Sequence, residues 1–126
     1  MEPLKIGDKV TAVYKTGKYI GEITNIRPEH YLVRILAVER HPMQGDIHSG
    51  KTTDVPIFHE RRALAFREQA NIPKKMVKPF SGEIPEYTDS LREAVRKLKE
   101  ELKSDDSDWA AKSLENIEVL EKDYFK

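Results

Sequence analysis

The N-terminal part of the chain alternates between apolar and polar positions with the period of two that is typical of β-strands. The alternation runs through 9–14 (KVTAVY) and returns in 19–26 (YIGEITNI), and 31–38 (YLVRILAV) is a run of β-branched and aromatic residues. Such residues favour strands. A turn signal around Gly17 and a second one at 27–30 (RPEH) separate the three stretches. The pattern therefore predicts an antiparallel three-stranded meander.

The middle of the chain has no comparably clear period. Residues 39–54 (ERHPMQGDIHSGKTTD) are polar with several Gly and Pro breaks, which predicts a long loop, and long ordered loops in small domains are often functional. Residues 55–58 (VPIF) favour a strand. Residues 59–71 (HERRALAFREQAN) combine good helix formers with a strand-like alternation, so both structures remain open. Residues 71–80 (NIPKKMVKPF) predict a turn at Pro73 that leads into a short strand.

Two amphipathic helices are predicted in the C-terminal part. In 88–103, apolar residues recur at helical spacing and form one stripe. The stripe consists of Leu91, Val95, Leu98 and Leu102. The expected N-cap is Thr88, Asp89 or Ser90. Ser90 and Glu93 have the spacing of a capping box.

The segment 104–108 (SDDSD) ends this helix, and Asp106 or Ser107 is expected to cap a second one. The second stripe consists of Ala110, Leu114, Ile117, Leu120 or Glu121, and Tyr124. Because the connection is short, the two helices are expected to form an antiparallel hairpin. Trp109 is the expected anchor of this hairpin on the strands.

The predicted fold is mainly β with C-terminal helices. We expect a small barrel over 1–80, a linker over 81–87 and a helical hairpin over 88–126 that packs on the barrel. A small antiparallel sheet has to close or be covered in order to protect its edges. A chain of 126 residues is long enough to bury a core without disulfides or metals.

Charge is distributed unevenly, although the 22 Lys and Arg residues balance the 22 Asp and Glu residues. Residues 1–80 carry 14 basic against 9 acidic residues, and residues 81–126 carry 8 against 13. The two parts therefore either attract each other or leave a basic surface for an acidic partner. The surplus is too small to make nucleic acid the favoured partner.

The chain contains no cysteine. This excludes disulfides, thiolate metal ligands and a cysteine nucleophile, and it is typical of a reducing compartment. The N-terminal sequence MEPLKIGDKV lacks the apolar run of a signal peptide or a membrane span. The sequence thus predicts a cytoplasmic protein with no direct insertion into a membrane.

Two resemblances specify the fold further. Residues 7–36 resemble the opening of an SH3-like or Tudor-like barrel, and 71–80 resemble the 3₁₀ turn and last strand of SH3-type domains. Four longer motifs resemble the kinase-associated protein B family of Bacillus-type spore formers, and the likeness covers nearly the whole chain. The motifs are YKTGKYIGE (14–22), HPMQGDIH (41–48), HERRALAFREQANIP (59–73) and GEIPEYTDSL (82–91).

The family resemblance implies an SH3-like barrel followed by helices, in which 55–66 supply the fourth strand. It also implies a regulatory role as an accessory of a sporulation sensor histidine kinase that acts upstream of a phosphorelay. The family is also called kinase-associated lipoprotein B, but this chain has no cysteine to acylate. Any proximity to a membrane is therefore expected to come through the kinase.

Three of the four histidines, His41, His48 and His59, lie close together in sequence and are weak candidates for a metal site. Their spacing lacks a tight ligand motif such as HExxH, so neither a metal nor another cofactor is expected. His59 and Glu60 are sequence neighbours, and neighbouring side chains of a strand point to opposite faces. Since GxSxG, P-loop and dinucleotide motifs are absent too, we do not expect an enzyme.

Docking to another protein is the favoured function. Arg61 and Arg62 are fork-shaped donors suited to the carboxylates of a partner, and arginine is enriched at interface hot spots. The expected partner-binding residues are His41, Asp46, His48, His59, Glu60, Arg61 and Arg62. Alternatively, the two arginines pair with Glu22, Glu60 or the acidic helices. The sequence leaves the oligomeric state open.

A nucleic-acid-binding barrel is the second candidate, because small barrels bind nucleic acid with a basic groove and exposed aromatic residues. The residue types are supplied by Tyr14, Lys15, Lys18, Tyr19, Tyr31, Arg34, Arg61 and Arg62. This candidate requires that the tyrosines are exposed and not part of the core. A histidine-rich metal-binding protein is the third candidate.

Overall fold

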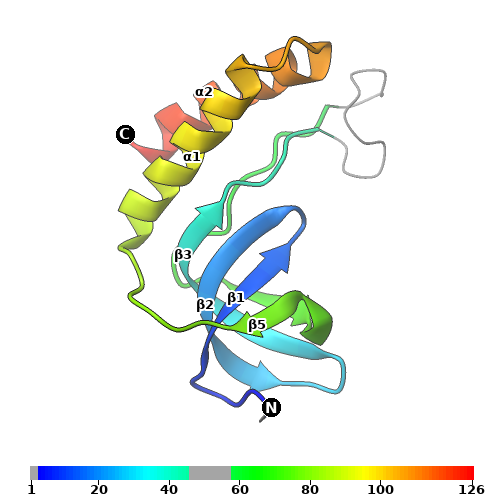
Figure 1. The fold of residues 1–126 in the computed structure, drawn as a ribbon, viewed down its shortest axis with the longest axis vertical. Helices are drawn as coiled ribbons and strands as arrows, with labels where there is room; N and C mark the ends of the chain where they lie inside the picture. Colours follow the sequence, from blue (N-terminus) through cyan, green and yellow to red (C-terminus); the bar gives the residue numbers. More distant parts are fainter. Residues whose placement is uncertain (1–2, 46–57) are drawn as a thin grey trace.

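The computed structural model describes residues 3–45 and 58–126, which form one antiparallel sheet followed by two helices (Figure 1). The strands are β1 (Lys9–Tyr14), β2 (Gly17–Ile26), β3 (His30–Arg40), β4 (Gln69–Pro73) and β5 (Val77–Pro79), with a 3₁₀ turn, η1 (Lys74–Met76), before β5. The helices are α1 (Tyr87–Lys103) and α2 (Asp108–Tyr124). The predicted fold class, a small β-structure with two C-terminal helices, is confirmed.

The three-stranded meander forms as the alternation predicts, and β1, β2 and β3 are neighbours in the sheet. The first turn consists of Lys15 and Thr16, which have φ angles of 46° and 71°. Two residues with positive φ make the type I′ turn that fits a tight hairpin. Gly17 follows this turn as the first residue of β2. A side chain does not fit there, because a Cβ would lie 2.6 Å from the Tyr19 hydroxyl.

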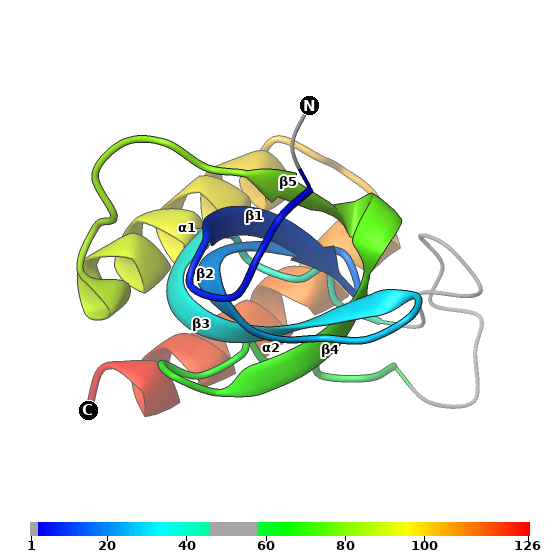
Figure 2. The same cartoon turned by 90° about the horizontal axis from the view of Figure 1, so that it is seen from below.

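The strands of the sheet are ordered β4-β3-β2-β1-β5, and β1 also contacts β4 across the interior. β5 pairs with the free edge of β1, with Val77 opposite Ala12 and Pro79 opposite Val10. Figure 2 shows the strands curving around a common interior. This interior is filled by the inward positions of the strands, including Val10, Ala12, Tyr19, Ile23, Val33, Ile35 and Ile72. The arrangement is the SH3-like barrel that the resemblance implies, including the 3₁₀ turn before the last strand.

The fourth strand is not where it was expected. The prediction placed it at 55–66, but β4 begins at Gln69, and residues 58–65 form neither a strand nor a helix. Residues 55–57 lie outside the described residues. The described part of the segment leaves the barrel and runs beside residues 41–45 instead (Figure 1). Local alternation cannot reveal this, because the partner of the segment is an irregular stretch and not a strand.

The start of α1 differs from the prediction in an informative way. Glu86 is the N-cap, and its carboxylate accepts hydrogen bonds from the amides of Thr88 and Asp89. Ser90, one of the predicted caps, is buried inside the helix. Its hydroxyl accepts a hydrogen bond of 2.9 Å from the amide of Val38 in β3. The residue that looked like a cap therefore ties the helix to the barrel.

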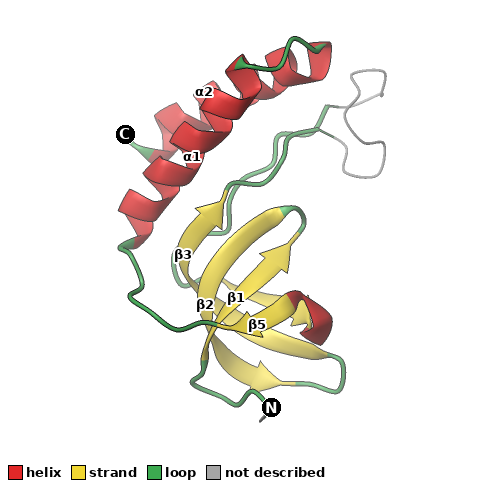
Figure 3. Ribbon diagram, viewed as in Figure 1, coloured by secondary structure: helices red, strands yellow, loops and turns green. Residues whose placement is uncertain are grey.

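The two helices lie against each other on one side of the sheet (Figure 3). All four residues of the predicted α1 stripe are buried. Ser107 caps α2 as predicted, through a 3.1 Å hydrogen bond from the Ala110 amide. Lys99 of α1 and Glu121 of α2 form an ion pair of 2.8 Å. One cluster of buried side chains extends from the barrel into both helices, so the helices share a core with the sheet.

Candidate partner-binding face

Residues 41–45 and 58–64 run side by side between the barrel and the helices, and a glutamine side chain joins them. Gln44 accepts a hydrogen bond of 2.8 Å from the Arg61 amide and donates one of 2.9 Å to the Arg61 carbonyl. The amide of Gly45 donates to the His59 carbonyl at 2.8 Å. The side chain of Gln44 thus replaces the backbone of a strand partner and satisfies the polar groups of Arg61.

His41 connects the same segments to the end of α2. Its Nδ1 lies 2.9 Å from the Pro42 carbonyl oxygen and its Nε2 lies 2.9 Å from the Tyr124 hydroxyl. The Ala63 amide also donates to this hydroxyl, at 2.9 Å. A carbonyl only accepts, so Nδ1 carries the proton and Tyr124 donates to Nε2. Burial, with a smaller contribution from the Arg62 charge, lowers the pKa of His41 to about 4.

The structure separates the predicted partner-binding residues into different environments. His41 is 1% exposed, so its place on a docking surface is corrected: a partner cannot reach it. His59 and Glu60 are exposed. Asp46 and His48 lie outside the described residues. The sequence pattern alone could not distinguish the buried histidine from the exposed one.

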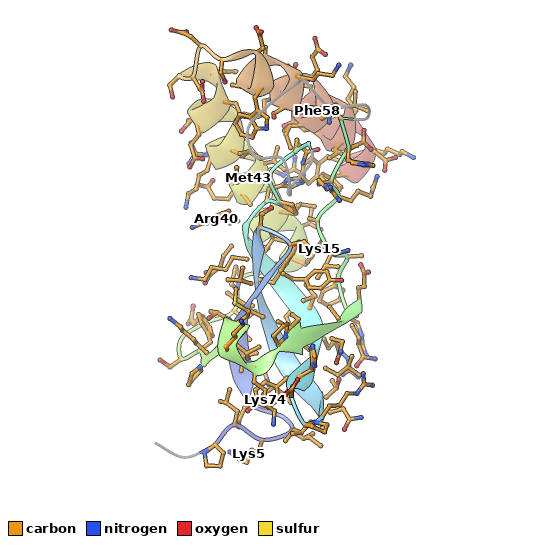
Figure 4. All side chains as sticks on the ribbon, turned by 90° about the vertical axis from the view of Figure 1, so that its right-hand side faces the viewer. Lys5, Lys15, Arg40, Met43, Phe58 and Lys74 are labelled. Carbon is orange, nitrogen blue, oxygen red and sulfur yellow. The ribbon has the colours of Figure 1, made fainter. Side chains whose placement is uncertain are left out.

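Glu60, Arg61 and Arg62 line a cleft of about 310 Å³ together with the β1–β2 turn. The other lining residues are Tyr14, Lys15, Tyr19, Pro42, Leu64 and Glu68. Figure 4 shows Lys15 at the turn, between the barrel and the helical part of the molecule. Its ammonium lies 5.3 Å from the centre of the Tyr14 ring. The cleft therefore brings three cations and two carboxylates to one surface.

Both arginines are partly used by the fold. Arg61 donates from Nε to the Gly45 carbonyl at 2.9 Å. The guanidinium of Arg62 forms an ion pair with Asp123 and lies over the Tyr124 ring, 5.0 Å from its centre. Lys126 and Arg62 together lower the pKa of the Asp123 carboxyl. The pairing with the acidic helices that the sequence left open is thus realised for Arg62.

The sequence analysis missed an apolar hollow of about 370 Å³ next to this cleft. It is lined by Leu36, Phe66, Ile84, Pro85, Glu86, Tyr87 and Thr88. Phe66 is 53% exposed, and its ring centre lies 5.7 Å from that of Tyr87. The Tyr87 hydroxyl donates to the Leu64 carbonyl at 2.5 Å. Since Leu64 lines the charged cleft, the two hollows are neighbours.

We call these two neighbouring hollows the 58–68 face, after the segment that runs between them. It combines an exposed aromatic side chain and an apolar floor with a rim of charges. Protein interfaces have this composition, with an apolar centre and a polar rim, and aromatic side chains dominate their binding energy. The sequence does not reveal this exposure, because the alternation of Leu64 and Phe66 with Ala63 and Ala65 permits a strand that would bury the ring.

Other ligand classes find less support in the described residues. No group of three His, Asp or Glu side chains in 3–45 and 58–126 is placed to hold a metal ion. Tyr19 and Tyr31, two proposed stacking residues for nucleic acid, are buried. Lys18 is paired with Glu39. Within the same residues, no helix has the length and apolar character to cross a membrane.

Comparisons with known proteins agree in sequence and in fold. The sequence model of the family described as kinase associated protein B matches residues 14–125. Kinase-associated lipoprotein B of Bacillus subtilis (strain 168) is 56% identical over 125 residues, which are 99% of this chain and 98% of that protein. The crystal structure of kinase-associated protein B from Bacillus cereus has a TM-score of 0.85 and 52% identity, and the match covers 97% of this chain and 98% of that one.

Proposed function

This chain belongs to the kinase-associated protein B family, and we propose that it is a non-enzymatic regulatory protein that binds a sporulation sensor histidine kinase upstream of a phosphorelay. We place this activity in the cytoplasm and assign the contact to the 58–68 face. The observation that carries the assignment is the exposed ring of Phe66 beside a charged cleft.

The exposure of Phe66 does not contribute to the stability of the fold. A large aromatic side chain contributes to stability by burial, yet half of this one remains in contact with solvent. Its ring lies against Tyr87, and Tyr87 is itself held by Leu64. A rigid aromatic residue in a preformed hollow loses little side-chain entropy on binding, which makes it a suitable anchor for a partner.

The charged cleft supplies the rim of the same surface. Glu60 and Lys15 are exposed there, and neither forms an ion pair within the described residues. Free charges beside an apolar centre select a partner of complementary charge and speed its association. Arg61 and Arg62 contribute to the surface as well, but their contacts to Gly45 and Asp123 also hold the segment in place.

The role proposed for the histidines is structural and not catalytic. His41 has both ring nitrogens engaged by Pro42 and Tyr124, and it is buried. A general base must have a ring nitrogen within hydrogen-bond distance of the proton that it abstracts, whereas both nitrogens of His41 are occupied. This observation supports a binding protein over a hydrolase.

The test is a binding titration of the purified protein with the purified cytoplasmic part of the sensor histidine kinase. Phe66→Ala and Glu60→Lys change exposed side chains of the face; Phe66→Ala also removes the ring contact with Tyr87, so its folding is checked by urea unfolding. Val119→Ala and Glu118→Lys are the matched controls, because both residues are exposed on α2. Reversal of the charge at Arg61 or Arg62 is less informative, since both side chains also hold the segment 58–68 in place.

We expect Phe66→Ala to weaken binding by about tenfold or more, as expected for an interface hot spot, and Glu60→Lys to change the association rate. The controls are expected to bind like the unmodified protein. If the unmodified protein binds the kinase and Phe66→Ala binds it equally well, the 58–68 face is not the contact. If the unmodified protein does not bind the kinase at all, the proposed partner is wrong.

A further inference from the structure

The end of the barrel opposite the helices is built from three segments that lie together. The amide of Gly7 donates to the Ile23 carbonyl at 2.8 Å, which places the N-terminal segment beside β2. The amide of Lys74 donates to the Glu29 carbonyl at 3.0 Å, which places η1 beside the β2–β3 turn. Figure 2 views the molecule from this end, and Figure 4 shows Lys5 and Lys74 there. We call residues 5–6, 26–30 and 73–76 the barrel tip.

The barrel tip exposes large apolar side chains that the fold does not use. Ile6 is 61% exposed, Ile26 is 41% exposed and Met76 is 37% exposed. They are three of the five large apolar residues that are exposed in the described part of the chain. Single exposed apolar residues are ordinary, but a group of them at one end of a molecule marks a surface that contacts something apolar.

Basic side chains surround these apolar residues. Arg27, Lys74, Lys75 and the nearby Lys78 of β5 form no ion pair within residues 3–45 and 58–126. Lys74 is held over the Tyr31 ring at 5.2 Å, and Arg27 donates to the Asn71 side chain at 3.2 Å. Lys5 of the tip and the nearby Lys9 are paired with Asp8 and Glu22. The tip and its immediate surroundings thus carry four cations that form no ion pair among the described residues, and Glu29 is the one carboxylate within the tip.

We propose that the barrel tip binds the anionic surface of a phospholipid bilayer. A surface that combines projecting aliphatic side chains with lysine and arginine is suited to the boundary between headgroups and acyl chains. The aliphatic groups enter the boundary while the cations attract anionic headgroups. A shallow hollow of about 530 Å³ provides space for a headgroup phosphate beside two lysines and one carboxylate; it is lined by Pro28, Glu29, His30, Pro73, Lys74 and Lys75.

Nucleic acid fits the tip less well than a bilayer. Proteins that bind single strands need exposed aromatic rings on which bases stack, but Tyr31 is only 8% exposed and the projecting side chains are aliphatic. The proposal also leaves the 58–68 face free, because the charged cleft lies at the β1–β2 turn, toward the helices. A protein bound to a membrane through its tip would therefore present that face to the solution.

The test measures sedimentation of the full-length protein with two kinds of vesicle, one of phosphatidylcholine alone and one that also contains phosphatidylglycerol. We expect binding only to the anionic vesicles, with an affinity that falls as salt is added. Lys74→Glu combined with Lys75→Glu is expected to weaken binding at least tenfold, since each cation near an anionic surface contributes roughly fivefold. Lys97→Glu combined with Lys122→Glu, on the exposed faces of the helices, is the matched control and should bind normally.

A second measurement locates the contact on the molecule. In Ile26→Trp, vesicles that contain brominated lipid should quench the new tryptophan, while buried Trp109 in the unmodified protein should show no quenching. The proposal is overturned if the protein does not bind anionic vesicles or if Ile26→Trp is not quenched. It is also overturned if the double variant of the helices, at Lys97 and Lys122, loses as much binding as the double variant of the tip, at Lys74 and Lys75. Binding to a single-stranded oligonucleotide without binding to vesicles would also overturn it.

Discussion

Protonation of His41 is expected to open the junction between the barrel and α2. In the folded protein the ring donates to Pro42 and accepts from Tyr124, so a second proton on Nε2 would face a donor. The nearby charge of Arg62 opposes the proton further. Unfolding exposes the ring to water, where it accepts the proton at its ordinary pKa of 6.5. Acid therefore favours the unfolded state.

The size of the effect follows from the two pKa values of His41. The pKa is lowered from 6.5 to about 4, and each unit of difference corresponds to about 1.4 kcal/mol. The stabilisation is fully present above pH 6.5 and is lost as the pH falls through 4, with a total of about 3 kcal/mol. Between pH 7 and pH 5 the expected loss is about 2 kcal/mol. The total is a large fraction of the stability of a typical small domain.

The assay is urea unfolding at a series of pH values, followed by the fluorescence of Trp109, which is buried and is the only tryptophan. Between pH 7 and 5 the carboxyl groups of Asp8, Glu22 and Asp123 contribute little, because their pKa values are lowered and they titrate in more acidic solution.

His41→Gln removes the titration but keeps an amide that can donate to Pro42 and accept from Tyr124. We expect this variant to lose most of the pH dependence. His59→Gln is the matched control, since His59 is exposed, and it should retain the dependence of the unmodified protein. If His41→Gln loses stability between pH 7 and 5 as steeply as the unmodified protein, another group is responsible and the role assigned to His41 is wrong.

Two further predictions concern the packing that positions the 58–68 face. Ser90→Ala removes the hydroxyl that accepts from the Val38 amide and leaves that buried amide without a partner. Urea unfolding should therefore show a free energy of unfolding that is lower by about 1–3 kcal/mol. The control Ser104→Ala, at the exposed end of α1, should change stability by less than half as much. Gly21→Ala places a Cβ 2.5 Å from the Arg34 carbonyl oxygen. Because the clash is with the backbone, we expect the free energy of unfolding to fall by about 1–3 kcal/mol. A melting temperature equal to that of the unmodified protein would contradict the close approach of β2 and β3.

The sequence was sufficient where local pattern and tertiary structure agree. The alternation in 9–38 specifies a meander because each strand pairs with the next one along the chain. The stripe from Leu91 to Leu102 specifies α1 because the helix buries one face. In both cases the interactions that decide the structure lie within a few residues or in the neighbouring element. Periodicity therefore carries the information.

The same reasoning fails where a side chain bonds to a distant segment. Ser90 has the spacing of a capping residue, but its hydroxyl is used by Val38, so Glu86 caps the helix instead. His41 resembles an exposed loop histidine until Tyr124 meets it from the far end of the chain. Within 58–65, the Gln44 side chain takes the place of a partner strand at Arg61, where it satisfies the backbone amide and carbonyl. No local pattern contains these contacts.

These distant contacts also decide where the candidate face is. The segment 58–68 has no regular structure of its own, and three aromatic hydroxyls hold it: Tyr19 of β2 accepts from the Leu64 amide, Tyr87 of α1 donates to the Leu64 carbonyl, and Tyr124 of α2 accepts from the Ala63 amide. The barrel and both helices thus each supply one support. Since Phe66 follows this anchored stretch directly, its position depends on the helices as much as on the sheet. The C-terminal helices therefore shape the binding surface as well as covering the barrel.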